Sequence, residues 1–213
     1  MQLDHVFICF DDASAAQGAL AAFGVQFGLH SFHPGQGTAN SCAFFENAYL
    51  ELLSTRVDAE VRSETVRPLA LWERLHWRQT GASPFGIALR SGDDGKGAKT
   101  WHYDAPFLPP GVGLPIVTPQ CMPDEPLIFL IPRNLPIQRP PATEHRGKRR
   151  VITGVTLRGP RVSPSPFHRS ESQDPEVFAL TKGAEHLLEL EWDNRAEGES
   201  WDFRPTLPLV IRW

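Results

Sequence analysis

A length of 213 residues allows one large domain or two small ones. With 41% hydrophobic and 22% charged residues, the composition is that of a soluble globular protein that can bury a core. The formal net charge of −4 argues against nucleic acid or an anionic membrane surface as the main partner.

The cysteines, Cys9, Cys42 and Cys121, are odd in number and show no CxxC spacing, so we expect neither a disulfide framework nor a structural zinc site. The first residues lack a basic segment followed by an apolar one, and no stretch approaches a membrane-spanning length. We therefore expect a cytoplasmic protein with no membrane partner.

The first 55 residues predict a β-α-β-β-β unit. Residues 3–10 are apolar, β-branched and aromatic, as is typical of a strand, and a period of two places Leu3, His5 and Phe7 on one face. A helix that Asp12 or Ser14 can cap follows, and Gly24 ends it. Residues 25–32 predict a second strand, and residues 41–45 and 48–54 predict a hairpin.

The rest of the chain resembles weaker copies of this unit. Pro68 suits a first helical turn and Gly81 suits a helix end, whereas residues 93–99 are rich in glycine and too short for a good helix. The expected organisation is a first module (1–55), a helical crossover (56–83), a second, eroded module (84–133), a Pro-rich basic linker (134–150) and a C-terminal β-rich part (151–213). The last part is either a third partial module or an extra sheet packed on the first two.

Three stretches carry a family resemblance: LDHV at residues 3–6, HPGQGTAN at 33–40 and NAYLELL at 47–53. In this order and spacing, the sequence resembles the glyoxalase-like branch of the vicinal-oxygen-chelate superfamily. The resemblance implies an α+β fold in which paired β-α-β-β-β modules form curled sheets around a cleft. Metal-dependent members bind a divalent ion through a His or Gln of a first strand and a Glu of a fourth strand in each module.

The resemblance places His5 at the first-strand ligand position and Glu51 at the fourth-strand one. It thus implies a divalent ion such as Zn, Ni, Mn or Fe on these two residues, with Glu51 as a catalytic proton carrier. The alternative is that His5 is a hydrogen-bonded core residue and Glu51 faces solvent.

The second module offers no matching ligands. Superposition of the strands places Gly86 opposite His5 and Leu130 opposite Glu51, and neither side chain has a donor atom. Glu189 of the last part could supply a third ligand, or it belongs to an amphipathic surface strand.

Other residues predict contacts with the bound molecule. Gly35 and Gly37 allow backbone N–H groups to approach an anion, and His33 and Asn40 could contact a carboxylate or carbonyl; the alternative is a turn that only links two strands. Arg90 shares strand parity with Gly86, so it either faces the cleft and a carboxylate or ends its strand in water. The aromatic residues at 101–103 could form a wall.

Two hypotheses for function follow. The first is metal-assisted lyase, isomerase or dioxygenase chemistry on a small, oxygen-rich acid. The second is a metal-free protein that binds or sequesters a small molecule in the same cleft; a purely structural module is a third interpretation. Because superfamily members often pair modules between chains, a homodimer is also compatible with the resemblance.

Overall fold

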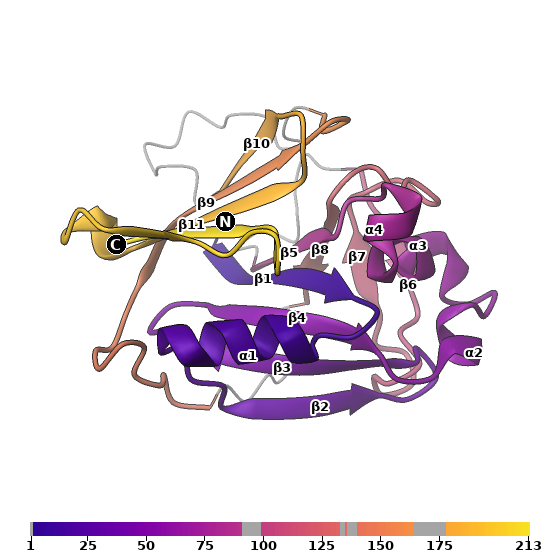
Figure 1. Ribbon diagram of the computed structural model, residues 1–213. Coiled ribbons are helices and arrows are strands. Elements are labelled where there is room, and N and C mark those ends of the chain that lie inside the picture. The colour runs from indigo at the N-terminus through magenta and orange to yellow at the C-terminus, as the bar shows by residue number, and fades with distance from the viewer. Residues whose placement is uncertain (1, 91–98, 133–134, 136–139, 164–177) are drawn as a thin grey trace.

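The computed structural model of the protein describes residues 2–90, 99–132, 135, 140–163 and 178–213. Within these residues the strands form two sheets (Figure 1). The larger sheet contains β1 (Gln2–Phe10), β2 (Leu29–His33), β3 (Thr38–Phe44), β4 (Tyr49–Thr55), β5 (Phe85–Arg90), β6 (Trp101–Tyr103), β7 (Leu114–Ile116) and β8 (Leu127–Ile131). The smaller sheet contains β9 (Ile152–Gly159), β10 (Phe178–Lys182), β11 (Leu187–Trp192), β12 (Ser200–Asp202) and β13 (Leu209–Arg212). The expected α+β fold with curled sheets is confirmed.

The first half of the larger sheet is the expected β-α-β-β-β unit, with strand order β2-β3-β4-β1. The helix α1 (Ser14–Phe23) connects β1 to β2 and ends at Gly24, whose φ of 102° gives the left-handed conformation that favours glycine. The N-cap is Ala13 and makes no side-chain cap bond. The Asp12 carboxylate instead accepts hydrogen bonds from the N–H and the hydroxyl of Ser14 just before the helix.

The second half of the larger sheet repeats this strand order as β5-β8-β7-β6. In each half the first and fourth strands are parallel, and antiparallel pairing of β1 with β5 joins the two halves. The expected pairing of two modules is therefore confirmed. Most of the glycine-rich stretch between β5 and β6, residues 93–98, lies outside the described residues, as do residues 134 and 136–139 of the expected linker.

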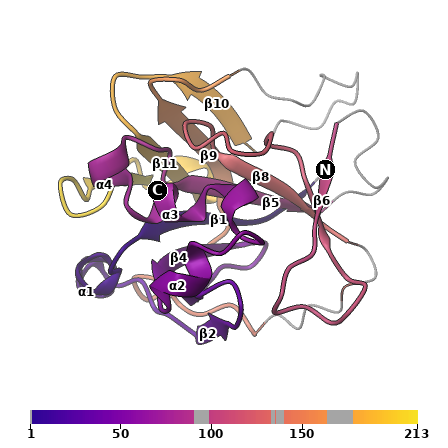
Figure 2. The ribbon, with the colours of Figure 1, turned by 90° about the vertical axis from the view of Figure 1, so that its right-hand side faces the viewer.

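The crossover between the modules consists of short helices: α2 (Asp58–Val61), the 3-10 helix η1 (Arg67–Leu69), α3 (Leu71–Leu75) and α4 (Trp77–Thr80). Figure 2 shows α2, α3 and α4 together on one side of the larger sheet. Pro68 lies in the first turn of η1, and Gly81 ends α4 with a φ of 75°, as the sequence predicts. The crossover thus covers the face of the larger sheet that does not contact the smaller one.

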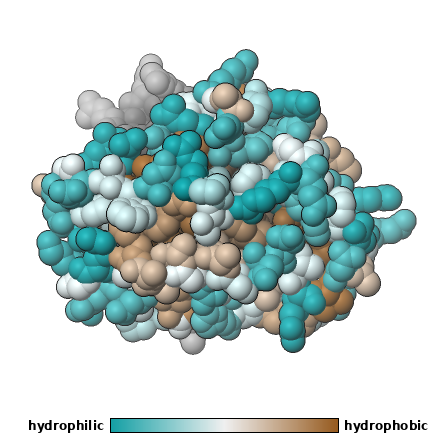
Figure 3. All heavy atoms as spheres, in the orientation of Figure 1, coloured by the Kyte–Doolittle hydropathy of each residue, from teal (hydrophilic) through white to brown (hydrophobic). Residues whose placement is uncertain are grey.

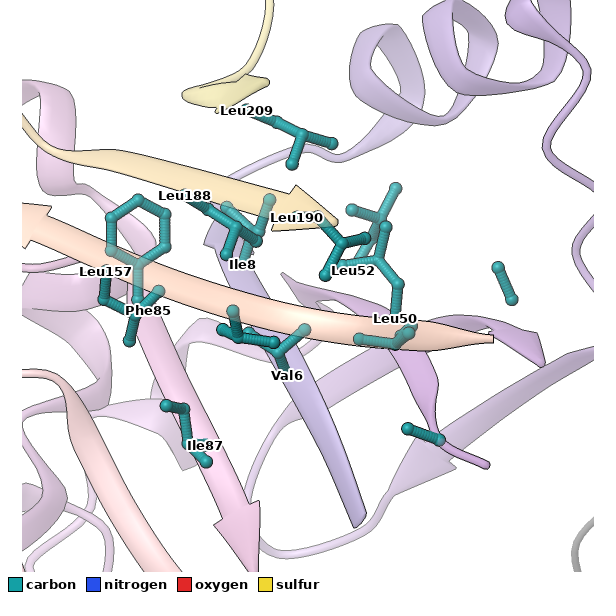
Figure 4. Close-up of a cluster of buried hydrophobic side chains, with 14 of the residues drawn as sticks. Val6, Ile8, Leu50, Leu52, Phe85, Ile87, Leu157, Leu188, Leu190 and Leu209 are labelled. Carbon is teal, nitrogen blue, oxygen red and sulfur yellow. The ribbon is translucent and has the colours of Figure 1, made fainter. Parts of the chain in front are cut away.

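The smaller sheet packs on the opposite face of the larger one, which decides between the two interpretations of the C-terminal part. Its strand order is β10-β9-β11-β13-β12, and the apolar residues of β9 and β11 face Val6, Ile8 and Leu50 (Figure 4). Leu188 and Leu190 are fully buried in this shared core. The strands β9–β13 therefore form an extra sheet that completes the core of the paired modules.

The outer surface is mixed in character. On the face shown in Figure 3, hydrophilic residues surround a smaller hydrophobic area near the middle. In the part of the chain that the structure describes, no helix is both long and apolar enough to cross a membrane.

Candidate functional site

The larger sheet encloses a cavity on the face that the crossover covers. The cavity has a volume of about 210 Å³ and is lined by residues from both modules. Its apolar wall includes Phe7 of β1, Leu114 of β7 and Phe129 of β8. Its polar lining comes from the first module and β6: His5, His33, Gln36, Asn40, Glu51 and Tyr103. The cavity is therefore an apolar space with polar groups from a few neighbouring strands.

A β-bulge in β1 sets the direction of His5. β1 has one residue more than β5 at this point, because Leu3 pairs with Leu89 while His5 pairs with Ala88. The extra residue, Asp4, shifts the alternation of side chains. As a result Leu3 packs in the core between the sheets, whereas His5 lines the cavity. The prediction that Leu3 shares a face with His5 is wrong for this reason.

The bulge also buries the Asp4 carboxylate completely. Its Oδ1 lies 2.7 Å from Nδ1 of His5, and its Oδ2 accepts a hydrogen bond from Nε of Arg90. The His5 ring stacks on Tyr49 at 4.3 Å and meets the edge of Phe129 at 5.7 Å. These contacts hold the imidazole in one orientation, with Nε2 on the side of the cavity.

Glu51 lies beside His5 on the neighbouring strand β4. Its Oε2 is 3.4 Å from Nε2 of His5, and its Oε1 accepts a hydrogen bond of 3.0 Å from the amide of Asn40. The side-chain oxygen Oδ1 of Asn40 in turn accepts a hydrogen bond from the backbone N–H of Ser31. The structure therefore brings His5, Glu51 and Asn40 together, as the sequence predicts.

His33, the last residue of β2, lines the cavity, but the glycines of the following loop face elsewhere. The Gly35 N–H donates to the Glu60 carboxylate at 2.8 Å, and the Gly37 N–H donates to the carbonyl of His33. Both glycines have φ values of 76°, and a Cβ on Gly37 would lie 2.4 Å from the carbonyl oxygen of Val57. Gly35 and Gly37 thus shape a tight turn, and their N–H groups bond within the protein rather than in the cavity.

Burial lowers the pKa of His33, and the nearby Glu51 carboxylate opposes this effect. Nδ1 of His33 lies 2.9 Å from the Thr38 hydroxyl, and its ring packs on Phe107 at 4.6 Å. His33 is therefore held at the cavity as a mainly neutral group at neutral pH.

Arg90 and Glu189 lie away from the cavity lining. Arg90 does share a face with Gly86 and Ala88, as its parity predicts, but its guanidinium pairs with Asp4. Glu189 lies on the outer face of the smaller sheet, where it forms ion pairs with Arg158 and Arg212. The structure therefore does not bring Glu189 to His5 and Glu51, and it favours the surface-strand interpretation.

The second module presents apolar residues where the first presents Glu51. The parallel register of β5 and β8 places Phe129 at the cavity, whereas Leu130 packs in the core between the sheets. Phe129, not Leu130, is thus the counterpart of Glu51. Gly86 gives room to the Phe7 ring, since a Cβ there would lie 2.0 Å from its Cζ.

These residues do not fit the four-ligand metal site that the family resemblance implies. The second module contributes a glycine and a phenylalanine, neither of which has a side-chain ligand atom. Among the described residues, no three His, Cys, Asp or Glu side chains are grouped so that they could hold a metal ion. His5 and Glu51 alone supply fewer protein ligands than the three that are usual for catalytic zinc.

Sequence reasoning missed two contributors to the site, Asp4 and Gln36. Asp4 directly precedes His5 in the LDHV stretch, but only the bulge turns it toward the ring. The Tyr103 hydroxyl donates to the Gln36 carbonyl oxygen at 3.1 Å, and the Gln36 amide donates to Thr38 at 2.8 Å. The expected aromatic wall at 101–103 is thus represented in the cavity by Tyr103.

Comparison with known families supports the resemblance. Residues 3–103 match the model of the family described as glyoxalase-like domain. This part of the chain, slightly less than half of it, is therefore similar to a glyoxalase-like domain. The matched region spans the first module, the crossover and the first two strands of the second module. A comparison with curated proteins gave no match.

Comparison with solved structures gave matches at low sequence identity. A hypothetical protein from Staphylococcus aureus is 10% identical with a TM-score of 0.55, over 99% of this chain and 97% of that chain. A methylmalonyl-CoA epimerase in complex with methylmalonyl-CoA and NH4+ is 16% identical with a TM-score of 0.39, over 61% of this chain and 92% of its own. A Streptomyces coelicolor methylmalonyl-CoA epimerase in complex with 2-nitronate-propionyl-CoA is 17% identical with a TM-score of 0.38, over 61% and 95%. The Staphylococcus match shows that the whole fold, with its extra sheet, occurs elsewhere.

Proposed function

We propose that this protein binds a small molecule in the cavity of its paired modules, with an apolar body against the second module and a polar group beside His5 and Glu51. The observation that carries this proposal is the division of the cavity lining. Apolar side chains such as Leu114, Leu127 and Phe129 surround the space, and the polar groups gather on the first module. Pockets for small molecules commonly have this composition, with a few polar groups that fix orientation.

The cavity volume limits the size of the bound molecule. An apolar cavity of about 150 Å³ accommodates benzene. A space of about 210 Å³ therefore suits one ring with small substituents. The aromatic side chains around it, including Phe7 and Tyr49, favour a flat ligand.

The metal-assisted alternative depends on the close approach of Nε2 of His5 and Oε2 of Glu51, which are 3.4 Å apart. Because the second module adds no ligand, we favour binding without a metal. The catalytic role of Glu51 stays a prediction, as do the cytoplasmic location and the homodimer.

Thermal unfolding in EDTA tests the proposal. A ligand that binds only the folded state raises the melting temperature, and the rise grows with the ratio of the ligand concentration to its dissociation constant. We expect toluene or phenol to stabilise the wild type and the Leu29→Trp variant, in which an exposed edge-strand residue is enlarged. Leu53→Trp, which fills the cavity from β4, should abolish the shift.

Two results would overturn this function. One is equal stabilisation of Leu53→Trp and the wild type, which would place the ligand elsewhere. The other is stabilisation by Zn, Ni, Mn or Fe that His5→Gln removes, combined with no effect of either ring compound, which would favour the metal-assisted alternative.

A further inference from the structure

We propose that Asp4 fixes the proton of His5 on Nδ1 and thereby makes the polar end of the cavity a pair of hydrogen-bond acceptors, which selects ligands that carry a hydroxyl or amine over carboxylates. This inference rests on the proposed function, because it specifies which small molecules the cavity takes.

Nδ1 of His5 has a buried carboxylate as its partner. Asp4 is completely buried, its Oδ1 is 2.7 Å from Nδ1 of His5, and Arg90 donates to its Oδ2. The guanidinium stays charged and pairs with a carboxylate, and an ionised carboxylate can only accept hydrogen bonds. The hydrogen between Asp4 and His5 therefore belongs to Nδ1, and in the neutral ring Nε2 carries a lone pair.

Nε2 of His5 and Oε2 of Glu51 lie too far apart for a strong hydrogen bond. Charge-assisted N–H···O bonds are about 2.7–2.9 Å long. The Nε2–Oε2 separation of 3.4 Å is longer, as expected where two acceptors face each other without a shared hydrogen. Asn40 already donates to Oε1 of Glu51. Nε2 of His5 and Oε2 of Glu51 can thus both receive a hydrogen from a ligand.

Tyr103 and Gln36 are hydrogen-bond donors that also line the cavity. The Tyr103 hydroxyl donates to Gln36, and the Gln36 amide donates to Thr38, so both of these hydrogens bond within the protein. A carboxylate ligand beside Glu51 would meet a like charge in an apolar space. Phenols and alcohols avoid this repulsion and donate their one hydrogen to either acceptor, and a primary amine can donate to both. This ligand class replaces the carboxylate-bearing ligand that the sequence predicts.

The tautomer of His5 can be determined in the protein without any ligand. In EDTA at pH 8.5, about two pH units above the usual pKa of histidine, long-range ¹H–¹⁵N spectra distinguish Nδ1–H from Nε2–H, and His5→Gln assigns the signals. We expect Nδ1–H for His5 in the wild type and in Asp12→Asn, an exposed aspartate variant. Asp4→Asn should move the proton to Nε2, because the Asn amide can donate to Nδ1 while its oxygen still accepts from Arg90. Nε2–H in the wild type, or an unchanged tautomer in a folded Asp4→Asn variant, would overturn the proposal.

Binding of three matched ring compounds tests the ligand class. Phenol should bind wild type about tenfold more tightly than toluene, as expected for a hydrogen bond to a charged acceptor, and benzoate should bind more weakly than both. In Asp4→Asn the phenol-to-toluene ratio should fall toward one. Equal affinities for the three compounds, or a preference for benzoate, would overturn the inference while leaving cavity binding intact, whereas failure of all three to bind would refute the proposed function itself.

Discussion

His145 lies in the interior where the chain enters the smaller sheet. Its ring stacks on Phe45 at 4.2 Å, its Nδ1 accepts the backbone N–H of Gln26, and its Nε2 donates to the carbonyl of Phe44 at 2.9 Å. Protonation of Nδ1 would break the bond to Gln26. Burial lowers the pKa of His145, although the Phe44 carbonyl partly opposes this effect.

This arrangement predicts a pH-dependent stability. The unfolded chain binds a proton at the ordinary histidine pKa of about 6.5, whereas the folded state binds it only at lower pH. The neutral histidine therefore makes its full contribution to the free energy of unfolding above pH 7. This free energy decreases as the pH falls toward 5, by up to about 1.4 kcal/mol per pH unit for each such histidine. His33 and His186 have lowered pKa values of the same origin and add to the slope.

Urea denaturation between pH 7 and 5 measures this slope. We expect a shallower slope for His145→Gln than for the wild type. An equal slope in the two proteins would show that His145 does not titrate differently in the folded state.

For single residues, the sequence predicts which residues lie at the site better than it predicts the directions of their side chains. The family resemblance points to His5 and Glu51, and the structure places both at the cavity beside Asn40. Their roles stay predictions. The bulge at Asp4 depends on the pairing of β1 with β5, which are far apart in the chain. No local pattern reveals it, and so the partner of Arg90 and the direction of Leu3 could not be predicted.

Among the elements, the helical crossover depends on a buried arginine. Arg74 of α3 is only 1% exposed, and burial lowers its pKa to about 10, so it remains charged at neutral pH. Its guanidinium donates to carbonyl groups of the crossover and of the segment before β8, those of Leu69, Ser83, Met122, Pro123 and Glu125. One side chain thus connects the crossover to the loop that precedes β8.

Arg74→Met should destabilise the protein by at least about 3 kcal/mol, because several buried carbonyls lose a charged donor at once. Arg67→Met, an exposed position in η1, should change the free energy of unfolding by less than about 0.5 kcal/mol. Urea denaturation at pH 7 measures both. A cost for Arg74→Met as small as that of the control would show that the carbonyls find other donors.

Sequence patterns predict the first module well, because alternation gives the strands and Gly24 marks the helix end. They are weaker for the second module. Superposition of the sequences selects Leu130 as the counterpart of Glu51. The residue that lines the cavity is Phe129, one position earlier. The alternating pattern around Glu189 correctly indicates an amphipathic strand, but it does not tell which sheet that strand joins.

In the whole molecule, the two sheets share one core. Val6, Ile8 and Leu52 of the larger sheet and Leu157 and Leu190 of the smaller one form a single cluster (Figure 4). Neither sheet can expose this face without a large loss of buried apolar area. The paired modules and the C-terminal sheet should therefore unfold together.

Leu190→Ala tests this coupling. We expect a loss of about 2–5 kcal/mol, with far-UV circular dichroism and tryptophan fluorescence still reporting the same urea midpoint. Leu29→Ala, at an exposed position of β2, should leave the midpoint nearly unchanged. Separate transitions for the two signals would mean that the smaller sheet unfolds on its own.

The most direct test of ligand binding in the cavity is a crystal structure with 4-bromophenol, in which the anomalous signal of bromine locates the compound. We expect one strong anomalous peak inside the cavity, near Leu114 and Phe129. The phenol oxygen should lie within hydrogen-bond distance of Nε2 of His5 or Oε2 of Glu51. A cavity without the compound, or a ring whose oxygen points away from both residues, would contradict it.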